Sequence, residues 1–141
     1  MPTSDSTILE DVRIGVRLKI AALWTAVLFL FAYGDIFGFF NTGRIEEVIA
    51  GEVSGIKITQ VYLLGVSVYV AIASVMIFLT LVLTPKVSRW INIVLSILYV
   101  ASIVASVIGE TWAYFYFLSI VESALLLLIL RYAWRWPRQL A

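Results

Sequence analysis

Four long apolar stretches, separated by short polar segments, make up most of the chain. They cover about residues 19–40, 60–83, 90–108 and 112–130. Each is long enough for an α-helix to cross the apolar core of a bilayer, which is roughly 30 Å thick and takes about 20 residues. Their interiors hold two or three acidic side chains and no basic one. We therefore predict an all-α fold in which residues 1–141 form one integral membrane domain, an antiparallel four-helix transmembrane bundle.

The connections between the later stretches are short. Residues 108–111 leave so little room that the third and fourth helices are expected to form a tight antiparallel hairpin, and residues 84–89 predict the same for the second and third. Thr59, Ser88 and Thr111 lie where the second, third and fourth helices are expected to begin, so we expect their side chains to act as N-caps.

Two segments outside the apolar stretches carry their own pattern. Apolar residues in the N-terminal segment predict a short cytoplasmic helix over about residues 7–18. Residues 41–59 form an outer loop, in which Ile45, Val48 and Ile49 indicate one or two helical turns. Because these three side chains share one face, the turns are suited to lie flat on the outer membrane interface.

The positive charges fix the expected orientation. In a four-span topology only Arg44 and Lys57 fall on one side, and eight basic residues fall on the other: Arg13, Arg17, Lys19, Lys86, Arg89, Arg131, Arg135 and Arg138. Because Lys and Arg are enriched in cytoplasmic segments, both termini are predicted to be cytoplasmic.

Composition narrows the possible chemistry. Charged residues make up 13% of the chain, about half of the roughly 25% found in soluble domains. The net charge of +1 gives no reason to expect a nucleic-acid partner. The chain has no Cys and no His, which excludes thiol redox chemistry, His-ligated haem and Cys/His zinc sites. We expect no cofactor or metal, and any proton transfer falls to carboxylates and tyrosines.

Glu122 is the strongest single candidate for function. Counted from Thr111 at 1.5 Å per residue, it lies about 16 Å deep, near the middle of a bilayer. A charged side chain there costs ~2.5–3.5 kcal/mol on insertion scales. One interpretation is a site for a proton, a cation or a polar ligand inside the bundle. The other is a protonated side chain that hydrogen-bonds a neighbouring helix and fixes packing.

Asp35 is the second candidate, about five residues from the outer end of the first span. It either belongs to an outer entrance or is an interfacial acid that reaches water or Arg44. Neither Asp35 nor Glu122 has a Lys or Arg at membrane depth to pair with. Isolated carboxyl groups in such places stay protonated or bind a cation.

A polar stripe follows the third span, and it is expected to face the bundle interior. Its members recur at helical spacing: Asn92, Ser96, Tyr99, Ser106 and Glu110. The stripe is either a set of interhelical hydrogen bonds or the wall of a hydrated path or pocket. Tyr99 lies level with Glu122, which predicts a hydrogen-bonded pair. Tyr69 of the second span lies at a similar depth and adds an aromatic wall suited to a cation or amine.

An ordered set of short motifs resembles an uncharacterised family of small prokaryotic four-helix membrane proteins, a domain of unknown function. The motifs run from about residue 18 to 136: Tyr33-Gly34-Asp35-Ile36, Ile45-Glu46-Glu47 with Gly51, Ile58-Thr59-Gln60, Arg89-Trp90-Ile91-Asn92, Tyr114-Phe115-Tyr116-Phe117 and Tyr132-Ala133-Trp134. The resemblance implies the fold, the topology and a place in the cytoplasmic (inner) membrane of a prokaryote. It implies no reaction, and it singles out Asp35, Asn92 and Glu122 as positions to test.

Three functions are compatible with these residues. The favoured one is a binding or transport unit for a cation, an amine or a proton, with Glu122 as the coupling site, Tyr99 and Tyr69 shaping it, and Asp35 with Glu110 at an outer entrance. Four spans leave little room for a pathway, so a homo-oligomer is expected. The alternative is an accessory or scaffold protein whose buried polar groups only fix packing. A lipid-active enzyme is disfavoured, because the sequence offers no nucleophile–base pair.

Overall fold

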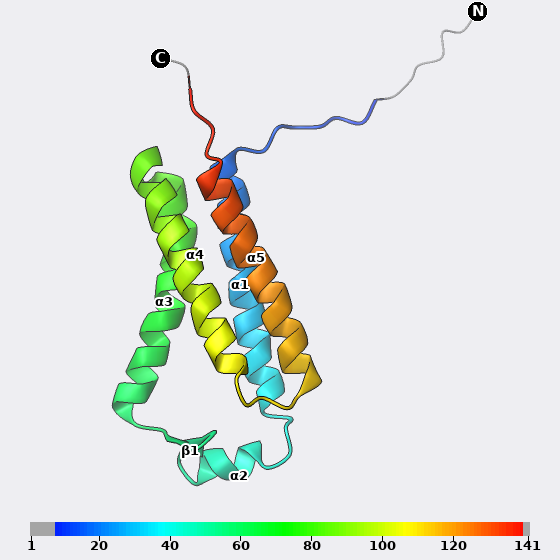
Figure 1. Ribbon diagram of the computed structural model, residues 1–141, viewed down its shortest axis with the longest axis vertical. Coiled ribbons are helices and arrows are strands. Elements are labelled where there is room, and N and C mark those ends of the chain that lie inside the picture. Colours follow the sequence, from blue (N-terminus) through cyan, green and yellow to red (C-terminus); the bar gives the residue numbers. More distant parts are fainter. Residues whose placement is uncertain (1–7, 140–141) are drawn as a thin grey trace, which may run out of the picture.

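The computed structural model describes residues 8–139 and consists mainly of four long helices (Figure 1). They are α1 (Val16–Gly38), α3 (Gln60–Val82), α4 (Pro85–Val107) and α5 (Ala113–Trp134). All four are long and apolar enough to cross a membrane, as predicted. At 1.5 Å per residue, helices of 22 or 23 residues measure about 33–35 Å, slightly more than the apolar thickness of a bilayer.

A small unit connects α1 to α3. It contains the six-residue helix α2 (Arg44–Ile49) and two short antiparallel strands, β1 (Glu52–Val53) and β2 (Ile56–Lys57). The helical turns were predicted, but the hairpin was not. Its strands have only two residues each, and the positive φ angles of Ser54 (49°) and Gly55 (78°) form the turn between them. Two residues are too few for an alternating pattern to be visible in a sequence.

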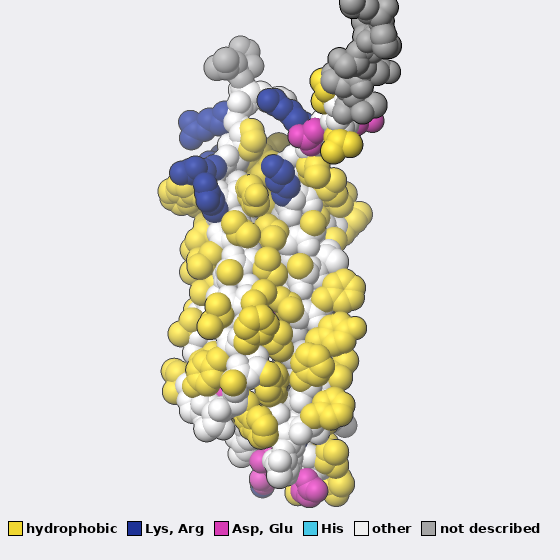
Figure 2. Space-filling model, turned by 90° about the vertical axis from the view of Figure 1, so that its right-hand side faces the viewer, with side chains coloured by type: hydrophobic (Ala, Val, Ile, Leu, Met, Phe, Trp, Pro, Cys, Tyr) yellow, Lys and Arg dark blue, Asp and Glu magenta, His cyan; other side chains and the backbone are white. Residues whose placement is uncertain are grey.

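The long helices lie side by side, and α1 packs against both α3 and α5, while α4 packs against α5. The first turn of α1 and the last turn of α5 lie at one end of the molecule, and the α2 unit lies at the other (Figure 1). We call the first end the basic end, because Lys and Arg side chains gather there above a surface that is largely hydrophobic (Figure 2).

The tight hairpin expected for the second and third spans forms only at its link. Leu83 and Thr84 join α3 to α4 directly, but α3 packs mainly against α1 rather than α4. Near the α2 unit the start of α3 stands apart from α4 (Figure 1), and within residues 61–68 only Tyr62 is not exposed. A short link fixes where two helices meet, whereas the side chains along them decide which neighbour each one follows.

Helix starts agree with the predictions at one position and differ at another. Thr59 caps α3, since its Oγ1 accepts a hydrogen bond from the Tyr62 backbone N–H at 3.1 Å. Ser88 does not cap the next helix, which begins earlier, at Pro85. Proline is favoured at this first position because its fixed φ suits a helix and its missing N–H would have no partner there.

The predicted N-terminal helix over residues 7–18 is wrong for the part that the structure describes. Residues 8–15 form no helix, α1 begins at Val16, and Thr7 lies outside the described residues. Gly15, at the N-cap of α1, has an extended backbone with φ −65° and ψ 153°. Fewer than about 12 residues rarely form a stable helix without packing, and Ile8, Leu9 and Val12 are all exposed.

Large apolar side chains fill the centre of the bundle. Trp24 of α1, Met76 of α3 and Leu126 of α5 are at most 1% exposed. Many other apolar side chains point outward, among them Phe29 at 62% and Ile120 at 68% exposure. An apolar core inside an apolar surface is typical of a bundle surrounded by lipid.

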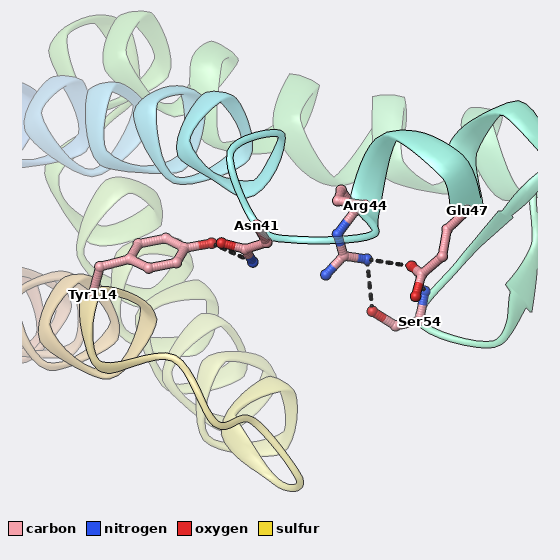
Figure 3. A network of polar contacts seen from close by, with 5 residues as sticks. All are labelled: Asn41, Arg44, Glu47, Ser54 and Tyr114. Carbon is pink, nitrogen blue, oxygen red and sulfur yellow. Dashed lines mark hydrogen bonds and ion pairs between the residues drawn. The ribbon is translucent and has the colours of Figure 1, made fainter.

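The α2 unit is held by polar contacts (Figure 3). Arg44 Nη1 donates to Glu47 Oε2 at 3.2 Å and to Ser54 Oγ at 2.9 Å, and the Ser54 backbone N–H donates to the same Glu47 oxygen at 3.3 Å. Asn41 Nδ2 donates to the Tyr114 hydroxyl at 3.1 Å, which ties the start of this unit to α5. The unit is therefore anchored to the bundle at its first residues.

Candidate functional site

Asn92 of α4 is the centre of a buried polar network. Its Oδ1 accepts the Trp24 indole N–H at 2.8 Å, and its Nδ2 donates to the Ser88 carbonyl at 2.8 Å and to Thr80 Oγ1 at 3.2 Å. The four side chains belong to α1, α3 and α4, and all are fully buried. Both polar atoms of the Asn92 side chain are thus satisfied by protein. This arrangement joins three helices and leaves no polar atom free for a ligand.

Tyr99 and Tyr69 form an aromatic cluster with Phe31. The ring centroids of the two tyrosines are 4.5 Å apart, and Phe31 stacks on Tyr99 at 6.2 Å. The Tyr99 hydroxyl donates to the Tyr69 carbonyl, and the Tyr69 hydroxyl shares a 2.7 Å hydrogen bond with Ser102 Oγ. The predicted hydrogen bond between Tyr99 and Glu122 is therefore wrong. The Tyr99 hydroxyl donates its hydrogen bond to a backbone carbonyl of α3 instead.

Glu122 lies inside the bundle on α5 and is only 7% exposed. Ser119, one turn earlier, is 6% exposed. Among residues 8–139, no hydrogen bond or ion pair joins the Glu122 carboxyl group to another residue. Burial of a carboxyl group without a partner is costly, since its hydrogen bonds to water are lost and none replaces them. Glu122 thus lacks the partners that Asn92 has. Within residues 8–139 the one completely buried polar side-chain atom without a partner is Arg89 Nε, so the Glu122 carboxyl oxygens are not completely sealed from the surface.

Asp35 lies near Glu122, on the neighbouring helix α1. Here α1 and α5 approach closely, because a Cβ added to Gly34 would lie 3.6 Å from Leu118 Cδ1. Leu118 precedes Glu122 by one helical turn, and Asp35 follows Gly34. The two carboxyl groups therefore lie on helices that pack against each other, with Asp35 nearer the α2 unit than Glu122. Unlike Glu122, Asp35 is exposed on the surface of the isolated chain.

Glu110 has a local structural contact that explains its position. It lies in the link between α4 and α5, and its Oε1 accepts the backbone N–H groups of Thr111 at 2.8 Å and Trp112 at 3.0 Å. Glu110 therefore binds free N–H groups just before α5, the function that we had expected of Thr111. The N-cap position itself is Trp112, whose side chain makes no cap.

The structure brings together only part of the predicted polar stripe. Asn92, Ser96 and Tyr99 are buried, whereas Ser106 is exposed and Glu110 lies beyond the end of α4. The stripe faces the bundle interior along the first part of α4, where this helix packs against its neighbours. Near the link between α4 and α5 the stripe no longer faces the interior. Within residues 8–139, no group of three or more Asp, Glu, His or Cys side chains is placed to hold a metal ion.

The sequence analysis did not predict that Trp24, Thr80 and Ser88 form a polar network with Asn92. Tryptophan is common at membrane interfaces, so a buried Trp24 in the first span was not expected to be a hydrogen-bond donor. One signal was present: Trp24, Thr80 and Asn92 all carry polar groups in the halves of their spans nearest the basic end. Only the packing of α1, α3 and α4 shows that these groups meet.

Comparison of the sequence with models of known protein families identifies the family of this chain. A model of a family of unknown function (DUF6326) matches residues 13–141, nearly the whole chain. The chain belongs to this family. The resemblance seen in the ordered motifs is thereby confirmed. No curated protein and no solved structure matches the chain. The family supplies no activity, so a function must be argued from the side chains themselves.

Proposed function

We propose that the protein binds or transports a cation, a cationic amine or a proton at Glu122, inside a membrane. The observation that carries this proposal is the difference between Glu122 and the other candidates. Asn92, Tyr99, Tyr69 and Glu110 each have protein partners, whereas the carboxyl group of Glu122, a residue only 7% exposed, has none among residues 8–139. Acidic side chains inside membranes pair with cations or carry protons far more often than they remain idle.

The surroundings of Glu122 fit a positively charged ligand. Asp35 lies on α1, which packs against α5, and Phe31, one helical turn before Asp35, contacts Tyr69 of α3 with ring centroids 5.7 Å apart. Aromatic rings attract cations through their electron-rich faces. Three helices thus contribute two carboxyl groups and an aromatic wall, and no Lys or Arg lies in the chain near these positions. The proposal assigns no catalytic reaction to the protein.

The proposal includes a membrane topology. The four long helices are proposed to cross the cytoplasmic membrane of a prokaryote as an antiparallel bundle, with both termini in the cytoplasm. The distribution of eight Lys and Arg residues against two supports this orientation. The α2 unit then lies outside the cell, and the basic end faces the cytoplasm.

A homo-oligomer is part of the same proposal, because Asp35 is exposed on a helix that would otherwise meet lipid. A carboxyl group against hydrocarbon is unfavourable, and a second copy of the chain would cover it. Native mass spectrometry of the detergent-solubilised protein tests this point. A single mass corresponding to one chain under gentle activation would exclude the oligomer.

A scaffold function is the second candidate, favoured by the α2 unit. This unit is stabilised by its own contacts, yet Ile45, Ile49 and Ile56 on it are 54%, 81% and 56% exposed. Such side chains suit contact with a partner or with the membrane interface. A scaffold would tolerate Glu122→Gln and would lose partner binding when Ile45 and Ile49 are replaced by Ser.

The two candidates are separated by measuring binding of tetraphenylphosphonium and Na⁺ to the purified protein in nanodiscs. We expect the wild type to bind at least one of these probes and Glu122→Gln to lose that binding. Glu46→Gln removes a carboxylate from the exposed α2 unit and is the matched control. Equal binding by wild type and Glu122→Gln would exclude Glu122 as the cation site.

A further inference from the structure

A shallow hollow of about 350 Å³ lies between α4 and α5 toward the basic end. Its floor is apolar and consists of two residues from each helix: Ile93, Ile97, Leu127 and Leu130. Ile97 and Leu127 are both 51% exposed, so the floor opens on the outer surface of the bundle. In a membrane this surface meets the acyl chains of lipids.

Arginine side chains lie at the end of this hollow that is nearest the basic end of the molecule. Arg131, Trp134 and Arg135 line it. A third arginine, Arg89, lies one helical turn before Ile93 and donates from Nη2 to the Trp134 carbonyl at 3.4 Å. The Arg89 Nε is buried and has no hydrogen-bond partner. A buried N–H group of a cation without an acceptor indicates that something outside the chain completes its contacts.

These arginines have no carboxylate partner. Within residues 8–139 the one ion pair joins Arg44 to Glu47, at the opposite end of the molecule. A second hollow, of about 310 Å³, shares Arg135 and adds Arg13 and Lys19. Within residues 8–139, Arg135 therefore has no ion-pair partner on either side of the end of α5. Figure 2 shows Lys and Arg side chains gathered at this end.

We propose that the hollow between α4 and α5 binds an anionic phospholipid of the cytoplasmic leaflet. The phosphate lies against Arg131 and Arg135, and an acyl chain runs along the floor. This inference rests on the proposed membrane insertion but is independent of Glu122. Guanidinium groups bind phosphate oxygens through paired hydrogen bonds, and basic pockets between membrane helices on the cytoplasmic side suit anionic head groups. The apolar floor distinguishes a lipid from a free anion.

Native mass spectrometry with added phosphatidylglycerol or phosphatidylcholine tests the site. We expect the wild type to bind phosphatidylglycerol more tightly, and the variant carrying Arg131→Gln and Arg135→Gln to bind it roughly 30-fold more weakly, from ~1 kcal/mol per basic residue. Arg138→Gln removes the same charge from the same end without touching the hollow, and should bind like the wild type. Both replaced arginines are exposed, and each single variant is available if the double variant does not fold.

Ile97→Trp separates a lipid from a free phosphate. It fills the apolar floor and keeps every charge, so binding of phosphatidylglycerol should weaken while binding of inorganic phosphate does not change. The proposal is overturned by equal affinity for the two lipids, by unchanged binding in the arginine variants, or by displacement of the lipid by an equal concentration of inorganic phosphate. Extraction of cell membranes with carbonate tests insertion separately, so failure of the lipid site is distinguishable from failure of the membrane proposal.

Discussion

Buried polar side chains of this bundle differ in whether a partner lies within reach. Asn92 meets three other polar residues, and each hydrogen bond removes part of the cost of its burial. Glu122 is only 7% exposed, but within residues 8–139 its carboxyl group has no hydrogen-bond or ion-pair partner. The first residue stabilises the fold, whereas the second costs free energy unless a proton or cation joins it. Burial alone does not distinguish the two cases.

The structural function of Asn92 predicts the effect of removing it. Asn92→Leu keeps the volume but leaves the Trp24 indole N–H and the Thr80 hydroxyl without their partner, so we expect a loss of about 1–3 kcal/mol in the free energy of unfolding. Unfolding in mixed detergent micelles with increasing SDS measures this loss. Ser106→Ala on the same helix, where the side chain is exposed, is the control. A loss no larger than that of the control would show that the network contributes nothing.

Residue types and spacing identified which side chains to examine, but not their partners. The six candidate residues came from counting depth along the helices and from the helical spacing of the polar stripe, which together correctly placed Asn92, Tyr99 and Glu122 inside. The same counting paired Tyr99 with Glu122. The Tyr99 hydroxyl instead donates to the Tyr69 carbonyl of α3. The rotation of each helix about its own axis decides which side chains face each other. That rotation depends on the packing of all four helices and is not visible in one sequence.

At the scale of elements, backbone groups at helix ends are satisfied by side chains from other elements. Arg17 Nη1 of α1 donates to the Leu81 and Leu83 carbonyls, each at 2.8 Å, at the end of α3. The Arg17 guanidinium also lies 5.9 Å from the centroid of a Trp136 ring. One side chain thus connects the start of α1, the end of α3 and the residues after α5.

Replacement of Arg17 tests this connection. Arg17→Gln removes the charged donor, and we expect the free energy of unfolding to fall by on the order of 1–2 kcal/mol, a value reduced for partial exposure. Arg13→Gln, at an exposed position without a helix-end contact, is the matched control. Thermal unfolding in detergent, followed by circular dichroism, compares the two. Equal stability of the two variants would mean that the contact with α3 is not stabilising.

Helix lengths and links were predictable at this scale, and the choice of neighbours was not. The apolar stretches located the four helices to within about five residues at each end, because twenty consecutive apolar residues have few alternatives. The pairing of α3 with α1 had no such signal. Similar apolar residues cover all faces of these helices, and their polar positions mark an interior without identifying a partner.

At the scale of the whole molecule, charged and apolar side chains are distributed along the long axis of the helix bundle. Most Lys and Arg residues lie at the basic end, the α2 unit with Arg44 and Lys57 lies at the opposite end, and apolar side chains cover most of the surface between them (Figures 1 and 2). This arrangement matches a bilayer with the basic end toward the cytoplasm. In the proposed orientation, the proposed lipid site lies in the inner leaflet and the carboxyl groups of Glu122 and Asp35 lie farther toward the outer side.

The absence of cysteine from the chain makes this orientation simple to test. A single cysteine at Thr42 or Lys57, next to α2, should react with a membrane-impermeant maleimide in intact cells. A single cysteine at Lys86 or Gln139 should react only after the cells are opened. The reverse labelling pattern would invert the topology, and labelling of all four positions in intact cells would exclude a stable orientation.

The most direct test of the central proposal is infrared difference spectroscopy of the protein in nanodiscs, with and without Na⁺ or tetraphenylphosphonium. Glu122→Gln identifies the Glu122 bands, and Asp35→Asn identifies those of the neighbouring carboxyl group. We expect the cation to remove the C=O stretching band of protonated Glu122 and to produce carboxylate bands that Glu122→Gln lacks. A Glu122 band that is unchanged by either probe, with Glu122→Gln altering only stability, would contradict the proposal and make Glu122 a packing residue.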